Sequence, residues 1–412
     1  MRTFIISLLL CCTFLSVQAQ KYKSYKGLVM AGYQGWFAAE GDESNRGWYH
    51  YGGRGFRPGG TISIDFWPDM TEYTKKYVTP FKLKDGSDAY LYSAYDEESV
   101  DLHFKWMKEY GIDGVFMQRF VGEAKSPAGK RHFNKVLASA LKAAKKYDRA
   151  ICVMYDLSGS GPNDMDFILE DWKELQSLFS LKDTKVNPTY LHHNGSPVLT
   201  LWGVGFNDGR RYSIANVDYV VTKLKEGGNI SIMLGVPYYW SEFGNDTEKS
   251  PALHELIKKA DIVMPWAVGR YNSDTYTGIA SKTLPADIAW CKANKVDYVP
   301  LVFPGFSWGN LKKNPNIFNQ IPRDKGKFLW KQIAGAKAAG AEMLYVAMFD
   351  EVDEGTAIFK CALEKNVPLN GDLRFVGIDD DLKSDHYLWL VGEAGKWVRG
   401  GTGYSSTIPV RK

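Results

Sequence analysis

The sequence has 412 residues, with 51 Lys and Arg against 47 Asp and Glu, so its formal net charge is only +4. Such a small charge is typical neither of a nucleic-acid-binding protein nor of one held to an anionic membrane surface. The length suits one large α/β barrel or two ordinary domains, and no Pro/Ser-rich linker or charge block divides the chain.

The first residues predict an export signal. Arg2 precedes an apolar run from Phe4 to Val17, and a small-x-small pattern predicts cleavage after Ala19. The run is too short for a membrane span, and the residues before Cys11 do not make a lipoprotein pattern, which favours free export over a lipid anchor. We therefore expect residues 20–412 to be a soluble catalytic domain, periplasmic or extracellular, with a net charge of +3 because only Arg2 is lost.

Three cysteines remain after the signal, at Cys152, Cys291 and Cys361. Three cysteines in a chain of this size do not make a disulfide framework. Cys152 lies in an apolar run and is predicted to be buried in the core. A disulfide between two of the three stays open, and the sequence does not predict the oligomeric state.

Short apolar runs recur along the chain, and each is typical of a strand buried on both faces of a parallel sheet. They predict strands at 28–31, 112–117, 150–154, 197–201, 230–234, 262–264, 298–302 and 344–349. Amphipathic patterns between and after them predict helices at 96–110, 133–147, 165–179, 212–225, 253–259, 284–293, 328–339 and 387–398. Strands joined by helices are parallel, and eight such units predict a closed (β/α)8 TIM barrel with the first strand beside the eighth.

An open doubly wound sheet is the alternative fold. That fold leads us to expect a Gly-rich phosphate-binding turn after the first strand. Gly32 and Gly35 do not make the dinucleotide-binding pattern. The sequence therefore favours the barrel.

A long insertion rich in Gly and aromatic residues follows the first strand. Its aromatic residues include Trp48, Tyr49, Tyr51, Phe56, Phe66 and Trp67, against totals of 13 Trp, 24 Tyr and 21 Phe in the chain. Long structured loops inside compact domains are usually functional. We expect the insertion to form part of the wall of a binding cleft, although ordinary core packing must account for most of the aromatic residues.

Barrel enzymes place their working residues just past the carboxyl ends of the strands. Here those positions are aromatic, hydrogen-bonding or acidic, as suits a sugar ligand. The predicted substrate-binding residues are Tyr33, Gln34, Trp36, Trp67, Gln118, Arg119, Tyr155, Asp156, Trp202, Tyr238, Tyr239, Trp240, Trp266, Arg270, Trp308 and Asp350.

The eighth strand runs directly into four acids, Asp350, Glu351, Asp353 and Glu354. Crowded carboxylates repel, so at least one should keep its proton to an unusually high pH, as a general acid beside a general base requires. Residues three apart on a straight strand face opposite sides, so the chain must turn at Val352–Asp353 for both glutamates to reach one sugar. The alternative is a solvated acidic turn.

The sequence shows no signal for a cofactor or a metal. His192–His193 is predicted to be a turn rather than a metal site, and residues 379–381 lack the spaced ligands of a calcium loop. No Ser-centred nucleophile elbow is present. Aromatic walls with two acids therefore predict a glycoside hydrolase; a barrel that binds carbohydrate without catalysis is the alternative, and a metal hydrolase ranks third.

Residues 349–356, Phe-Asp-Glu-Val-Asp-Glu-Gly-Thr, resemble the Phe-Asn-Glu-Trp-His-Glu-Gly-Thr motif of glycoside hydrolase family 99, the endo-α-mannosidases and endo-α-mannanases. Residues 107–115 are similar to that family's second-strand entry, and residues 299–305 resemble its seventh strand. The order of elements agrees over most of the mature chain. The chain also resembles the broader group that joins family 99 to family 71, the α-1,3-glucanases.

The resemblance implies a mechanism. Glu351 would take the proton from the substrate's own 2-hydroxyl, which attacks the anomeric carbon. Glu354 would protonate the leaving oxygen and then activate water to open the resulting 1,2-anhydro sugar, so that the configuration is retained. This differs from the usual retaining scheme, in which a carboxylate is the nucleophile.

Three departures from the family pattern concern residues that grip the sugar. Asp350 stands for the family's Asn, and Val352–Asp353 for its Trp-His pair. Residues 153–157, Val-Met-Tyr-Asp-Leu, replace its His-Ile-Glu-Pro-Tyr signature. The sugar, its linkage and endo or exo action therefore stay open.

Overall fold

The computed structural model describes residues 20–369, 374–400 and 405–411. The predicted signal peptide, residues 1–19, lies outside the described residues. Across the described ranges, the helices are all too short or too polar to cross a membrane.

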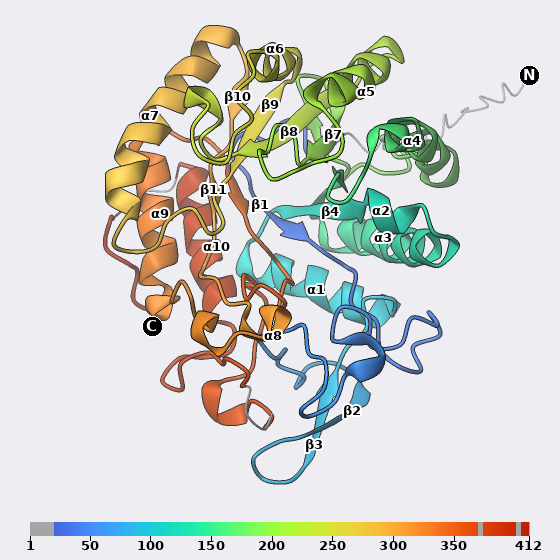
Figure 1. The fold of residues 1–412 in the computed structure, drawn as a ribbon, viewed down its shortest axis with the longest axis vertical. Helices are drawn as coiled ribbons and strands as arrows, with labels where there is room; N and C mark the ends of the chain where they lie inside the picture. Colours follow the sequence, from blue (N-terminus) through green and yellow to red (C-terminus); the bar gives the residue numbers. More distant parts are fainter. Residues whose placement is uncertain (1–19, 370–373, 401–404, 412) are drawn as a thin grey trace, which may run out of the picture.

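Parallel strands form a closed barrel at the centre of the molecule (Figure 1). In chain order they are β1 (Val29–Tyr33), β4 (Gly114–Phe120), β5 (Ala150–Asp156), β7 (Ser196–Trp202), β8 (Ser231–Pro237), β9 (Ile262–Trp266), β10 (Asp297–Tyr298), β11 (Leu301–Val302) and β12 (Leu344–Val346). β10 pairs with β9 and β11 pairs with β12, so these two short pieces serve as one strand. β1 lies beside β12, with Val29 opposite Leu344, which closes the circle and confirms the predicted (β/α)8 barrel.

Helices surround the barrel (Figure 1). They are α1 (Glu97–Tyr110), α2 (Val121–Ala124), α3 (Pro127–Tyr147), α4 (Met165–Phe179), α5 (Ile214–Glu226), α6 (Ala252–Lys259), α7 (Tyr276–Asn294), α8 (Gly309–Lys312), α9 (Lys327–Ala338) and α10 (His386–Val398). Two of them, α3 and α7, begin more than a full turn earlier than predicted. α3 starts at a Ser126 cap, whose hydroxyl accepts from the Gly129 amide at 3.0 Å. α7 contains Pro285, which interrupts its helical pattern.

The barrel interior is filled by side chains. Gly32 of β1 faces inward, and a Cβ atom there would lie 2.1 Å from Met348 Cε and 2.3 Å from the Tyr345 hydroxyl. The Tyr345 hydroxyl also lies 3.5 Å from Met154 Sδ. Such a packed core is typical of TIM barrels, and it leaves the carboxyl ends of the strands as the place for a site.

The insertion, residues 34–96, packs against the chain that follows β12. It contains the antiparallel hairpin of β2 (Tyr77–Lys82) and β3 (Asp88–Leu91). Bridges join Phe66 to Val376 and Pro68 to Cys361. In Figure 1 the blue insertion and the orange-red chain lie together at one end of the molecule. Most of its aromatic rings form a cluster of their own, which includes Tyr51, Phe56, Trp67, Phe81 and Phe375.

Two smaller predictions can be compared with the structure. His192–His193 forms a short strand, β6, antiparallel to β7 rather than a turn, and His193 Nε2 lies 2.9 Å from the Asp297 carboxylate. The three described cysteines are buried free thiols, and Cys152 is fully covered in the core as expected.

Candidate active site

The four acids lie in one tight turn, which we call the acidic loop, residues 350–355. The Phe349 amide still donates to the Gly32 carbonyl at 2.7 Å, and the chain then turns over residues 352–355. The Ala357 amide donates back to the Glu351 carbonyl at 2.8 Å. Gly355 is needed here because its φ is +63° and a Cβ atom would lie 2.9 Å from the Phe66 ring. The chain therefore turns at the position where a turn is needed for both glutamates to reach one sugar.

Asp350 binds the backbone beyond β1. Its Oδ1 accepts from the Gln34 amide at 2.7 Å and its Oδ2 from the Gly35 amide at 3.0 Å. The side chain is fully buried, and burial raises the pKa of Asp350 to about 7 although both hydrogen bonds lower it. Asp350 therefore holds β1 and the acidic loop together, and both its oxygens are already engaged.

The charge of Glu354 acts on the titration of Glu351. Glu351 is 5% exposed and accepts a hydrogen bond from Gln34 Nε2 at 2.5 Å. Burial, followed by the charge of Glu354, raises the pKa of Glu351 well above its usual value. Burial and then Asp353 raise the pKa of Glu354 to about 7, against the opposing charges of Lys312 and Arg270. The two carboxyl groups therefore keep protons to a higher pH than isolated glutamates do, as crowded and buried acids should.

His50 is a residue of the site that the sequence did not reveal. Its Nδ1 lies 3.3 Å from Asp353 Oδ2, and its Nε2 lies 3.1 Å from Glu123 Oε1. Its ring stacks on Trp36, with 3.6 Å between centroids and 8° between planes. Arg46 Nη2 donates to Glu123 at 2.7 Å. His50 and Arg46 lie in the irregular insertion, where no periodicity or motif points to them.

Aromatic and charged side chains from other strand ends surround the acidic loop. Trp202 and Trp266 meet edge to face, with 5.0 Å between centroids, and both are half-buried. Asp156 is paired in register with Trp202, and burial raises its pKa to about 6. The charges of Asp156 and Arg270 both act on Glu354, which places them on its side of the barrel. Arg270 itself pairs with Asp246.

Trp308 and Tyr239 are also half-buried at this end of the barrel. Trp308 Nε1 donates to Gln320 at 2.8 Å, and Lys312 Nζ lies 4.7 Å from its ring centroid. The structure thus connects seven of the predicted residues in or around the acidic loop: Gln34, Trp36, Asp156, Arg270, Asp350, Glu351 and Glu354. Trp202 and Trp266 stand at the ends of β7 and β9.

Tyr33, Tyr155 and Arg119 lie behind the strands. The Tyr33 hydroxyl is 2.8 Å from His103 Nδ1 of α1. The Tyr155 hydroxyl and the Arg119 guanidinium both donate to Asp171 of α4, at 2.6 Å and at 2.5 and 2.6 Å. Successive side chains of a strand face opposite sides, so these three point away from the barrel interior, while Gln118 and Asp156 point into it. The structure places the three in packing contacts and not among groups that a substrate would meet.

Three further predicted binding residues lie in packed regions away from the acidic loop. Trp67 Nε1 donates to the Tyr90 carbonyl at 3.0 Å inside the insertion. The Tyr238 hydroxyl lies 2.7 Å from Thr283 Oγ1, and Trp240 Nε1 donates to Asp287 at 3.2 Å. Gln118 faces the interior beside Met154, below the acidic loop. Tyr238 and Trp240 follow a strand and Trp67 lies in the aromatic insertion, which predicted a binding role for each. Contacts with α7 and within the insertion cover these three side chains.

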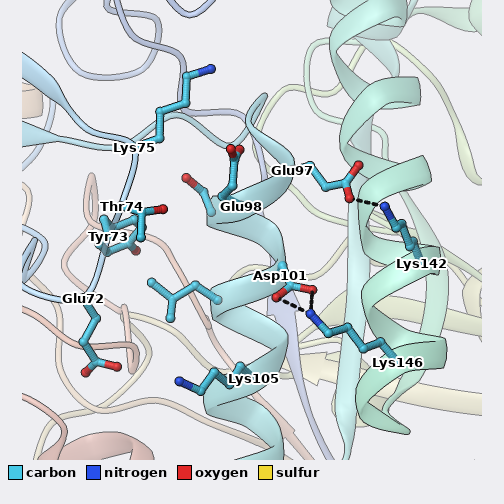
Figure 2. Close-up of a pocket in the computed structure, with 12 residues that line it drawn as sticks. Glu72, Tyr73, Thr74, Lys75, Glu97, Glu98, Asp101, Lys105, Lys142 and Lys146 are labelled. Carbon is cyan, nitrogen blue, oxygen red and sulfur yellow. Dashed lines mark hydrogen bonds and ion pairs between the residues drawn. The ribbon is translucent and has the colours of Figure 1, made fainter.

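A large groove lies away from the strand ends. It measures about 650 Å³ and lies between the segment around Tyr73, α1 and α3 (Figure 2). Its charges pair with each other, as Glu97 does with Lys142 and Asp101 with Lys146. No strand end lines it, so it is not where a barrel places its chemistry.

Within the described ranges, no three His, Cys, Asp or Glu side chains converge as metal ligands. That the reaction needs neither metal nor cofactor stays a prediction.

Fold and site together define a class of protein: a (β/α)8 barrel with coupled carboxyl groups and aromatic side chains at the carboxyl end of its strands. Among solved structures, the glycoside hydrolase family 99 endo-α-mannosidase from Bacteroides thetaiotaomicron has a similar fold. The TM-score is 0.62 over 92% of this chain and 100% of that chain, at 15% identity.

A second structure of that enzyme, in complex with bis-tris-propane, gives the same TM-score of 0.62 over 92% of this chain and 98% of that chain, at 15% identity. A glycoside hydrolase-like protein gives 0.52 over 81% of this chain and 94% of that chain, at 13% identity. No family model and no curated protein match the sequence. At these identities the comparisons show a shared fold.

Proposed function

We propose that the protein is a glycoside hydrolase that cleaves an α-linked glycan with retention of configuration. The observation that carries this proposal is that Glu351, which is buried, and Glu354, which is half-buried, lie in one turn beyond β12, where the charge of Glu354 raises the pKa of Glu351. The shared fold with a family 99 enzyme supports it. Half-buried Trp202 and Trp266 at the ends of β7 and β9 suit the apolar faces of sugar rings.

The proposed reaction has two steps. First, the Glu351 carboxylate takes the proton of the substrate's 2-hydroxyl, whose oxygen displaces the glycosidic oxygen while Glu354 protonates that leaving group. Next, Glu354 takes a proton from water, which opens the 1,2-anhydro sugar, and Glu351 returns its proton to the 2-oxygen. Gln34 orients Glu351 through its amide, and Asp350 holds the Gln34 backbone.

The order of the two roles comes from the family resemblance. In the free protein the electrostatics favour the opposite order, because Glu351 is the more deeply buried of the two and the cations Lys312 and Arg270 act on Glu354. For the family's order of roles, a bound sugar must therefore raise the pKa of Glu354 above that of Glu351. Otherwise the two residues exchange their roles. Substrates that differ in their leaving group distinguish these cases.

We expect Glu351→Gln and Glu354→Gln each to lower turnover of a natural glycan by at least about a hundredfold, the usual range for acid–base groups. On a substrate with an activated aryl leaving group, Glu354→Gln should recover most of its rate, since little protonation is needed. Glu351→Gln should stay impaired, because the 2-hydroxyl must still be activated. Glu109→Gln, on the exposed face of α1, is the control.

The measurement is product release from a glycan panel, with the anomeric configuration followed by NMR. The opposite leaving-group pattern would exchange the two roles. Full activity in either variant would remove that residue from catalysis. Binding of a glycan by the wild-type protein without any product would instead indicate the alternative, a carbohydrate-binding barrel that is catalytically inactive.

We also propose that the chain is exported, either to the periplasm or outside the cell. The signal-like pattern of residues 1–19 supports this. The amino-terminal sequence of the protein recovered from the producing cell should begin at Gln20; an uncleaved chain in the cytoplasm would contradict export.

A further inference from the structure

His50 stands where three segments meet beside the glutamate pair. Both of its ring nitrogens face carboxylate oxygens, with Nδ1 3.3 Å from Asp353 and Nε2 3.1 Å from Glu123. An ionised carboxylate only accepts hydrogen bonds, and a neutral imidazole has a single N–H donor. Both contacts are satisfied together when the ring carries two protons, which makes it an imidazolium.

The surroundings of His50 hold the ring in this place. It lies flat on the Trp36 indole, with 3.6 Å between centroids, and the face of an indole attracts a cation. Trp36 in turn stacks on Phe120. The backbone of His50 has a φ of +62°, a left-handed conformation that residues other than glycine adopt uncommonly. A strained backbone thus presents the ring to the two acids.

The titratable groups around His50 come from three segments. Glu123 of α2 and Asp353 of the acidic loop contact its ring nitrogens, and the Tyr49 ring of its own segment lies 4.7 Å from the His50 ring. Arg46, from the same segment as Tyr49, binds Glu123. The two carboxylates outweigh burial and raise the pKa of His50. Through Asp353 the effect reaches the catalytic pair, because the charge of Asp353 raises the pKa of both neighbouring glutamates, Glu351 and Glu354.

We propose that His50 is a positioning residue of this site, whose imidazolium ties Asp353 to Glu123 and offsets the negative charge that Asp353 places beside Glu351 and Glu354. The inference rests on the proposed hydrolase function and adds a residue to it. With His50 charged, one glutamate ionises at a pH where the other keeps its proton. Without that charge, both glutamates hold their protons to a higher pH, and the base is available over a narrower pH range.

The first test needs no substrate. With ¹⁵N-labelled histidine, both His50 ring nitrogens should be protonated at pH 7 in the wild-type protein, and Asp353→Asn should lower the pKa of His50. The His50 signal is assigned from its loss in His50→Gln. A ring that is neutral at pH 7 in the wild-type protein would overturn the proposal.

The second test is the pH profile of kcat/KM. His50→Gln keeps a hydrogen-bond donor but no charge, so the pKa of the base should rise and the acid limb should move up by about 0.5 to 1 pH unit. At the wild-type optimum, kcat should fall about two- to fivefold with KM within about twofold, and His50→Lys should return the limb toward its wild-type position. An unchanged limb in His50→Gln would overturn the proposal.

His254→Gln is the matched control. His254 is also half-buried and stacks on an aromatic ring, that of Phe243 at 4.2 Å, but it lies on α6 in the outer layer. Its substitution should leave both the limb and kcat unchanged. An equal shift in this control would show that the effect is general and would also overturn the proposal.

Failure of the proposed function gives a different result. If the wild-type protein cleaves no glycan, the titration of the Glu354 carboxyl group, followed by its ¹³C signal, decides the inference on its own. His50→Gln should then move that titration to higher pH, and no movement would overturn the proposal. Should His50→Gln not fold, as judged by circular dichroism, the His50 titration in Asp353→Asn decides instead.

Discussion

The aspartates and glutamates of this site differ in the groups that their carboxylate oxygens contact. Asp350 is fully buried and uses both oxygens on backbone amides of the β1 exit. Glu351 has a single side-chain partner, the amide of Gln34, and Asp353 has His50. The carboxyl group of Glu354 is half-buried and has opposing charges around it. Asp350 is thus a structural acid, and the two glutamates are available for chemistry.

Asp350→Asn restores the residue that stands in the family 99 motif. In this chain its amide group must meet a backbone N–H of Gln34 or Gly35, so we expect the free energy of unfolding to fall by about 1–3 kcal/mol. The charge of Asp350 also raises the pKa of Glu351, so its loss should move the acid limb of activity to lower pH. Urea unfolding and a pH profile measure the two effects.

The pH dependence of stability has a definite sign. The pKa of Asp350 rises from 3.8 to about 7 on folding. The contribution of Asp350 to the free energy of unfolding is therefore fully present below pH 4 and is lost as the pH rises through about 7. The deficit of Asp350→Asn should therefore shrink between pH 5 and pH 8. Asp88→Asn, on the exposed hairpin, should show no such change; a constant deficit in Asp350→Asn would contradict the prediction.

Among the elements, the acidic loop is held by two neighbours that bear no catalytic role. Asp65 of the insertion accepts from the Ser307 hydroxyl at 2.5 Å and from the amides of Gly309 and Asn310 at 2.7 and 2.8 Å. Its own amide donates to the Val352 carbonyl at 2.9 Å. The insertion, the segment after β11 and the acidic loop therefore form one connected unit.

Buried Arg323 completes this unit from the other side. Its Nη2 donates to the carbonyls of Gly355 and Ala357 at 3.0 and 2.6 Å, and its guanidinium stacks on Phe66 at 4.2 Å. Burial lowers the pKa of Arg323, although the ring of Tyr387 favours the charged form. The exit of the acidic loop is thus anchored by a cation whose partners are carbonyls and rings.

We expect Asp65→Ala to lower the free energy of unfolding by about 2–4 kcal/mol, because three buried donors lose their acceptor. Turnover should fall as well, since the Ser307 amide donates to the Glu354 carbonyl at 2.9 Å. Asp69→Ala removes a carboxylate that serves only an exposed turn at Thr71, and should cost under about 0.5 kcal/mol. Equal unfolding midpoints in urea for the two variants would refute the connected unit.

At the scale of the whole molecule, barrel closure and the docked insertion bury the three cysteine thiols. Cys152 lies in β5, Cys291 in α7 and Cys361 in the chain after β12, and each is at most 1% exposed. Burial raises the pKa of all three thiols, and that of Cys361 to about 12. The thiols should therefore be inert in the folded state.

We expect residues 20–412 to show no reaction with a thiol reagent within minutes under native conditions, and three reacting thiols per chain in concentrated guanidinium. The count in denaturant serves as the control for the native count. One thiol per chain in denaturant would indicate a disulfide, and rapid native reaction would contradict the burial.

The sequence alone determined the architecture, because each strand and helix is encoded in a local pattern. Apolar runs such as 150–154 predict strands wherever both faces are covered, and the alternation with amphipathic segments leaves the closed barrel as the solution. The crowding of Glu351, Asp353 and Glu354 is local too, so the turn between them and a part of the rise in their pKa values could be inferred from spacing. Burial, the larger cause of that rise, depends on the tertiary structure.

Only the tertiary structure decided which residues past the strand ends face the acidic loop. The side chains of a strand alternate between its two faces, so Tyr155 points away from the barrel and its neighbour Asp156 points toward the interior. The end of an apolar run cannot be located to a single residue from the sequence, so the face of each residue could not be predicted. His50 could not be found at all, since it reaches Asp353 across 303 positions through an insertion with no periodicity. Contacts between distant irregular segments follow from packing, which no local pattern records.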